Sequence, residues 1–202
     1  MKKTILFSIL AAMFIFVASC SKDDETAPTD NPTTGHSFTG INKVSLTIDG
    51  NTQEFVFADE NYNTSVTDAS ITAGTKQTEY DSVYTEITMA ASGVFDHVTT
   101  GAMVISYFGT GTGTQDISFG LEDESGLDNF SGSVFMLMTD TSQMPIMYFL
   151  DVATANITSY GDVGGYIEGT FESSQVSDIN ENPLPNVTIS GNFKAVRFED
   201  GE

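Results

Sequence analysis

The sequence has no tryptophan, one cysteine, two histidines and few basic residues. The lack of tryptophan weakens a platform for stacking sugars, although the seven tyrosines could substitute. A single cysteine forms no internal disulfide, and the cysteine and histidines give too few sulfur and nitrogen ligands for a structural zinc or haem site. Seven Lys and Arg stand against 28 Asp and Glu. Nucleic-acid binding needs cationic groups that displace counterions from phosphate, so it is excluded, as is a polybasic attraction to membranes.

The amino-terminal residues have the pattern of an export signal. A basic start is followed by an apolar run over residues 5–17, which is shorter than the ~20 residues that span a bilayer. Ala18 and Ser19 then precede Cys20, as a lipoprotein signal peptidase requires. The sequence therefore predicts cleavage after residue 19 and acylation of Cys20. An ordinary secretory signal with an incidental cysteine is the alternative.

The residues after the cysteine resemble the start of Bacteroidota-type surface-exposed lipoproteins. The resemblance implies a surface-export signal and a lipid anchor in the outer leaflet of the outer membrane, facing the medium. A solvated charge run is the alternative reading. Acyl chains contribute ~0.8 kcal/mol per buried methylene, so two or three of them hold a protein durably. The signal residues are Lys22, Asp23, Asp24 and Glu25.

The segment 20–40 is predicted to be a disordered tether, because it has almost no apolar residues and is rich in Thr, Asp, Pro and Gly. A flexible chain of ~20 residues spans roughly 25 Å. Residues 41–202 contain no second linker and have a suitable length for one domain with a full core. Without Lys2 and Lys3, five basic residues remain against 28 acidic ones, a formal charge of −23.

Apolar and polar residues alternate with period two along residues 41–202, which predicts strands throughout and no helix. Asp49-Gly50 supplies the backbone conformation of a hairpin turn between two such runs. Residues 93–100 and 109–114 are predicted to be loops. The expected strands cover residues 44–48, 54–57, 83–89, 102–108, 117–119, 130–138, 146–152, 154–160, 165–171, 187–189 and 193–198. The fold class is therefore a single all-β domain, either an antiparallel β-sandwich or a β-barrel.

The last third of the chain carries a Gly-x-Ile-x-Gly-Thr-Phe strand at residues 165–171 and a closing strand with Gly-x-Phe at 191–193. These motifs resemble a family of uncharacterised β-rich, calycin-like lipoproteins from the same bacteria. The resemblance implies a β-rich fold and a lipoprotein's location, and no activity. Gly169 and Gly191 are predicted to mark bulges or tight strand bends, with the phenylalanines in the core.

No catalytic constellation is supported by the sequence. Asp96-His97 with Ser92 would supply parts of a triad, yet no Gly-x-Ser-x-Gly elbow is present. A chain with 28 acidic residues always contains some pair of carboxylates suited to glycoside hydrolysis, so such a pair is no evidence of that activity. The chain is therefore predicted not to be an enzyme, a hydrolase being the least favoured alternative.

Calcium is the one cofactor that the sequence leaves open. Asp178, Asn180 and Asn182 have the first spacings of a calcium loop, but Pro183 occupies the glycine position and Ile189 the position of the bidentate glutamate. Residues 122–129 form a second acidic loop. Simple solvation of both loops is the favoured reading. Separately, Asp81-Ser82-Val83 matches a short O-glycosylation pattern described in the same bacterial group, which makes Ser82 a candidate acceptor.

Residues 134–138 and 144–150 are apolar on both strand faces. A central strand pair covered on both sides is the favoured reading, and a surface or cavity for a lipid-like ligand or a protein partner is the alternative. The leading functional hypothesis is a non-enzymatic module that binds a small molecule, a glycan or a neighbouring outer-membrane protein. A structural or adhesion lipoprotein is the second hypothesis.

Overall fold

The computed structural model describes residues 39–59, 70–79, 82–95, 98–120, 132–139 and 144–200, and every structural statement below concerns these ranges. None of these residues is helical, so the predicted all-β class is confirmed. The strands are β1 (Asn42–Ile48), β2 (Asn51–Phe57), β3 (Ser70–Glu79), β4 (Ser82–Phe95), β5 (Val98–Phe108), β6 (Gly113–Asp116), β7 (Val134–Met138), β8 (Ile146–Tyr160), β9 (Tyr166–Ser177) and β10 (Val187–Arg197).

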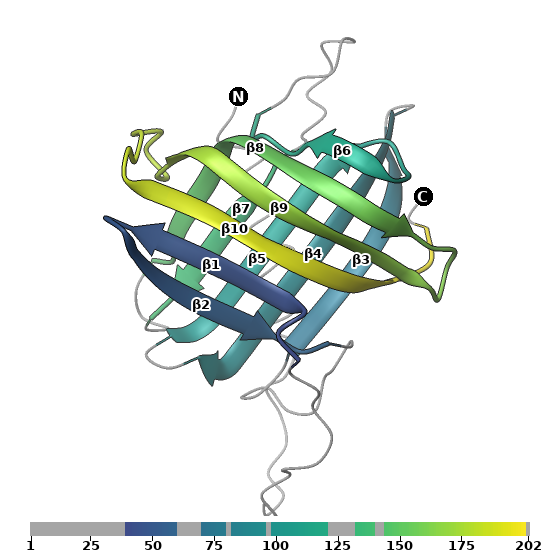
Figure 1. The fold of residues 1–202 in the computed structure, drawn as a ribbon, viewed down its shortest axis with the longest axis horizontal. Coiled ribbons are helices and arrows are strands. Elements are labelled where there is room, and N and C mark those ends of the chain that lie inside the picture. Colours follow the sequence, from purple (N-terminus) through teal and green to yellow (C-terminus); the bar gives the residue numbers. More distant parts are fainter. Residues whose placement is uncertain are drawn as a thin grey trace, which may run out of the picture. The chain divides into compact units, whose positions relative to one another are not determined.

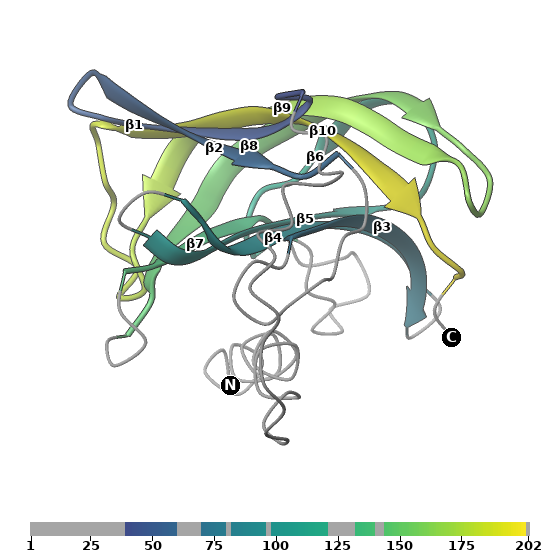
Figure 2. The same cartoon turned by 90° about the horizontal axis from the view of Figure 1, so that it is seen from below.

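The strands close into a seven-stranded barrel in the order β3-β4-β5-β7-β8-β9-β10 (Figure 1), which decides between the two predicted architectures. Closure comes from β10, which pairs antiparallel with β9 and, at its end, parallel with β3 through Val196↔Ala73 and Arg197↔Gly74. The β1–β2 hairpin extends the sheet from β10, and β6 extends it from β8. Figure 2 shows the layer that contains β1, β9 and β10 facing the layer of β3, β4, β5 and β7.

The β1–β2 hairpin forms as predicted. Asp49 and Gly50 have φ angles of 50° and 80°, which give the two positive-φ positions of a tight hairpin turn. Alternation then places Phe55 and Phe57 in the core, where they are at most 1% exposed. The hairpin therefore supplies aromatic bulk to the barrel interior from outside the seven-stranded ring.

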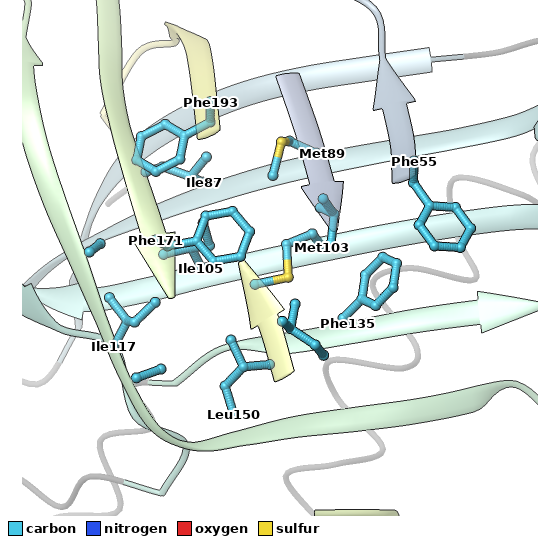
Figure 3. Close-up of a cluster of buried hydrophobic side chains, with 14 of the residues drawn as sticks. Phe55, Ile87, Met89, Met103, Ile105, Ile117, Phe135, Leu150, Phe171 and Phe193 are labelled. Atoms are coloured by element: carbon cyan, nitrogen blue, oxygen red, sulfur yellow. The ribbon is translucent and has the colours of Figure 1, made fainter. Parts of the chain in front are cut away.

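Side chains fill the barrel interior. Met89 and Met103 are fully buried, and Figure 3 shows Met103 between Phe171 and Phe135 and Met89 between Phe193 and Phe55. The Phe55 and Phe135 rings meet edge to face with centroids 5.3 Å apart. Interdigitated packing of this kind contributes most of the favourable free energy of folding. It also occupies the space in which a small barrel would otherwise hold a ligand.

The two glycines of the carboxyl-terminal motif make room for aromatic rings. Gly191 lies directly opposite Phe171, and Gly169 lies opposite Phe193. A Cβ on Gly169 would lie 2.8 Å from the Phe193 ring, and one on Gly191 would lie 2.7 Å from the Phe171 ring. An irregularity in β8 does occur beside Gly169. Pairing through Gly191 is unbroken on both sides, so no bulge occurs there, and a tight strand bend at Gly191 stays a prediction.

Strand β3 was not expected from the sequence, because its interior-facing residues are small or polar. Thr72 is fully buried, and a Cβ on Gly74 would lie 2.9 Å from Cδ1 of Ile167. Large side chains have no space there, so the apolar alternation that signals a strand is missing. Pairing with β4 over the whole length of β3 determines its conformation instead.

Other boundaries also differ from expectation. Most of the predicted loop at 93–100 lies in strands: β4 runs to Phe95, β5 starts at Val98, and these two residues are paired. The end of the predicted loop at 109–114 belongs to β6, while 117–119 lie outside any strand. The expected pairs 146–152 with 154–160, and 187–189 with 193–198, are the single strands β8 and β10. The predicted boundaries relied on the glycine and threonine content of the segments, and this content did not locate the strand ends correctly.

Candidate functional site

A groove of about 380 Å³ lies on the outer side of β1, β10, β9 and β8, which run side by side in Figure 1. We call it the polar groove, because hydroxyl, amide and charged side chains form most of its lining. The residues around it are Lys43, Ser45, Thr154, Asn156, Thr170, Phe171, Glu172, Ser190, Gly191 and Asn192.

Strand register arranges these side chains in two rows across the strands. Because directly paired residues project to the same side of a sheet, one row contains Ser45, Ser190, Glu172 and Thr154. The other row contains Lys43, Asn192, Thr170 and Asn156. Neighbouring strands lie about 4.8 Å apart, so each row presents a polar group at every strand that it crosses.

Most of the polar groove's side chains are uncommitted. Lys43 donates to Glu54 at 2.8 Å, and Asn192 donates to the carbonyls of Gly40 and Ile41. Within the described ranges, the remaining polar side chains of the lining form no hydrogen bond or ion pair with the protein. They are Ser45, Thr154, Asn156, Thr170, Glu172 and Ser190. Hydroxyl and amide groups both donate and accept, so these rows can exchange hydrogen bonds with a polar ligand in place of water.

The lining of the polar groove contains one basic side chain, Lys43, and one acidic side chain, Glu172. Each described basic side chain is in an ion pair: Lys43 with Glu54, Lys76 with Asp200, Lys194 with Glu168 and Arg197 with Asp200. Glu172 in the groove has no such partner among the described residues. Hydrogen bonds from Lys76 and then Arg197 lower the pKa of Asp200, which keeps that bridging carboxylate ionised.

The outer side of β5, β7 and the start of β8 carries a second set of outward-facing side chains, which we call the apolar outer face. It consists of Ala102, Val104, Val134, Met136, Met147 and Phe149, paired across β5, β7 and β8. These side chains are 2–9% exposed, yet they lie outside the interior cluster to which Met103 and Phe135 belong. The expectation of an apolar strand pair covered on both faces is thereby confirmed.

A buried polar cluster closes one end of the barrel. The Thr85 hydroxyl donates to the Gly109 carbonyl at 2.8 Å and lies 2.9 Å from Tyr160 Oη. Arg197 lies over the Tyr160 ring at 5.2 Å and donates to the Gly161 carbonyl at 2.8 Å. Burial raises the pKa of Tyr107 to about 12. Tyr107 therefore stays protonated at neutral pH.

The predicted calcium residues form a turn that satisfies itself. Oδ1 of Asp178 accepts hydrogen bonds from the backbone N–H of Asn180 at 2.8 Å and of Asn182 at 2.9 Å. The side-chain amide of Asn182 donates to Oδ2 of Asp178 at 3.0 Å, and these bonds hold the pKa of Asp178 below its ordinary value. In the described ranges, no group of three or more His, Cys, Asp or Glu side chains is placed to hold a metal ion. Calcium binding stays a prediction.

The other predicted sites lie at or beyond the edge of what the structure describes. Cys20, the export-signal residues 22–25, the pair Asp96-His97 and the acidic loop 122–129 are outside the described residues. Ser82 is the first residue of β4, opposite Glu79. The structure therefore does not test these predictions. The polar groove was not anticipated from the sequence, because its rows depend on which strands are neighbours.

Comparison of the chain with protein-family models, with curated proteins and with solved structures gives no match. The lipoprotein resemblance therefore stays a prediction. Over the described ranges, no helix has the length and apolar character needed to cross a bilayer.

Proposed function

We propose that this chain is a lipid-anchored, non-enzymatic binding module of the outer-membrane surface, and that its ligand binds in the polar groove. The lipoprotein part rests on the sequence pattern around Cys20 and on the residues that follow it. The observation that carries the binding part is the contrast between a filled interior and an open groove lined by uncommitted polar side chains.

The filled interior argues against a small apolar ligand inside the barrel. Pockets for such ligands are concave and mostly apolar, with a few polar groups that fix orientation. Here large side chains such as Tyr107, Phe135 and Leu150 occupy that space and are essentially unexposed. A structural or adhesion lipoprotein is the second candidate. A barrel with a filled interior is rigid, and its outer surface can then make contacts with other molecules.

Anchoring is tested by the variant Cys20→Ala, expressed with its signal sequence. Removal of the acyl acceptor is expected to release the protein from membranes, because the lipid chains supply the free energy of membrane association. The matched control is Ser21→Ala, which keeps the cysteine. Membrane fractionation and intact-mass measurement report the result. A Cys20→Ala protein whose mass shows that residues 1–19 have been removed, and which still stays in the membrane fraction, would disprove lipid anchoring at this residue.

Binding in the polar groove is tested by thermal unfolding of the mature protein with oligosaccharides, fatty acids and calcium. A ligand at 100 times its Kd stabilises the folded state by ~2.7 kcal/mol and raises Tm. Thr170→Tyr, which fills the groove, is expected to abolish the shift. Thr188→Tyr, an exposed position of β10 outside the groove lining, is expected to keep it. No shift with any ligand, or a shift that survives Thr170→Tyr, would exclude the groove.

A further inference from the structure

Resting on this proposed function, we infer that the polar groove takes a neutral glycan chain that lies across the strands. The first reason is the chemistry of the uncommitted side chains. The hydroxyls of Ser45, Thr154, Thr170 and Ser190 each donate and accept, and the Asn156 amide does both. Sugar hydroxyls have the same dual character, so each can be satisfied by a group in either row.

Charge excludes the anionic ligands that hydroxyls also bind. Glu172 lies in the row between Ser190 and Thr154, and the described residues give it no basic partner. The one cation of the lining, Lys43, is already neutralised by Glu54 at 2.8 Å. A phosphate, sulfate or uronate in the groove would approach an unpaired carboxylate and find no free cation, so the favoured ligand carries no charge.

Pairing of the strands argues against an extended peptide. Peptides that bind to sheets add a strand to a free edge through main-chain hydrogen bonds. In the polar groove, β10 and β9 are paired on both edges, β1 is flanked by β10 and β2, and β8 is flanked by β9 and β6. No strand edge opens into the groove, so recognition there depends on side chains alone.

The direction of the ligand follows from the rows. A chain lying across β1, β10, β9 and β8 meets a pair of polar groups about every 4.8 Å, one from each row. A ligand lying along one strand would instead alternate between outward side chains and backbone. The crossing direction therefore uses all the uncommitted groups, and a long oligosaccharide should bind more tightly than a disaccharide.

The inference is tested by titration calorimetry of the mature protein. Neutral probes are oligosaccharides from cellulose, xylan, mannan and dextran, and the charged probes are heparin, polygalacturonate and oligolysine. At least one neutral series is expected to bind, with affinity rising with chain length and little affected by salt. Thr170→Val and Asn156→Leu are each expected to weaken binding roughly two- to ten-fold, as loss of a hydrogen bond does. Thr188→Val, the matched control outside the groove, should leave the affinity unchanged, and thermal melts verify that each variant folds.

The variant Glu172→Gln, which removes the unpaired charge of the polar groove, distinguishes neutral ligands from charged ones. Binding of a neutral glycan should change by less than about two-fold, because the carboxamide keeps a hydrogen-bonding oxygen. The protein could instead bind only heparin, polygalacturonate or oligolysine, and lose this binding in Thr170→Tyr. That result would overturn the inference of a neutral glycan and leave the proposed function of the groove standing. Neutral-glycan binding unaffected by Thr170→Val, Asn156→Leu and Thr170→Tyr would overturn both, as would the absence of any ligand.

Discussion

The polar groove and the apolar outer face lie on the same barrel wall, and strand β8 contributes to both. Met147 and Phe149, near its start, face outward among apolar partners, whereas Thr154 and Asn156, near its end, face outward into the groove. The outward positions are odd-numbered in the first half and even-numbered in the second. One strand therefore changes which alternate residues face the core as it passes between the two regions.

An irregularity in pairing makes this change. The register between β8 and β9 shifts between Phe149 and Ala153. A bulge adds one residue, and a one-residue slip exchanges the two faces of a strand. Asp151, inside the shifted segment, accepts a hydrogen bond from Ser177 at 2.9 Å, which fixes the local conformation. The apolar outer face and the polar groove are therefore separated by a bulge within β8 and not by a change of strand.

The largest expected effect comes from placing a charge on each region. Met136→Asp should reduce the free energy of unfolding by about 3 kcal/mol or more, because the carboxylate would be buried without a partner. Thr154→Asp, at an exposed position of the polar groove, should reduce it by only about 0.5–1 kcal/mol, because the new carboxylate stays in water and meets only the like charge of Glu172 on the paired strand. Urea unfolding of both variants gives the comparison. Equal losses would show that the two regions do not differ in burial.

A smaller effect on the free energy of unfolding is expected from exchanging valine and threonine, which have nearly the same shape, in the two regions. Val134→Thr buries a hydroxyl on the apolar outer face and should cost about 1–2 kcal/mol. Thr154→Val removes one from the polar groove and should be neutral within about 0.5 kcal/mol. Chemical denaturation with unchanged m-values would report stability alone. A destabilising Thr154→Val would mean that its hydroxyl already has a structural partner.

The pH dependence of stability should distinguish Glu86, which borders the apolar outer face opposite Ser106. Burial raises the pKa of Glu86 above 4.5, and a hydrogen bond from Thr88 only partly offsets this. The folded state therefore holds the proton more tightly than the unfolded state, and stability falls as the pH rises through and above 4.5. Glu86→Gln should therefore be more stable than the wild type at pH 7. The variant and the wild type should be equally stable well below pH 4.5. A difference of the same size at both pH values would exclude this cause.

The smallest effect is expected at the edge of the polar groove. Lys43→Met removes the ion pair with Glu54. The two side chains are 29% and 54% exposed, so the free energy of unfolding should fall by about 0.5 kcal/mol or less. Thermal melts at low and high salt provide the measurement. A loss above about 1 kcal/mol would make Lys43 a structural residue of the groove.

Local patterns in the sequence were sufficient for the fold class, the Asp49-Gly50 hairpin and most strands, because one buried face leaves a period of two. They were insufficient for β3, whose buried residues are Thr72 and Gly74. They also could not give the polar groove, because Ser45, Ser190 and Thr154 become neighbours only through pairings between distant strands. Alternating threonines and serines were visible in the sequence, but their alignment into rows was not.

The most direct measurement is an NMR titration of the mature protein with the neutral oligosaccharide that binds most tightly. The backbone amide signals of Thr170, Ser190 and Thr154 should move, because they lie beneath the polar groove. The methyl signals of Met89 and Met103 in the filled interior, and of Met136 on the apolar outer face, should stay in place. Movement of those methyl signals while the groove amides stay unchanged would show that the ligand binds inside the barrel or on its other side.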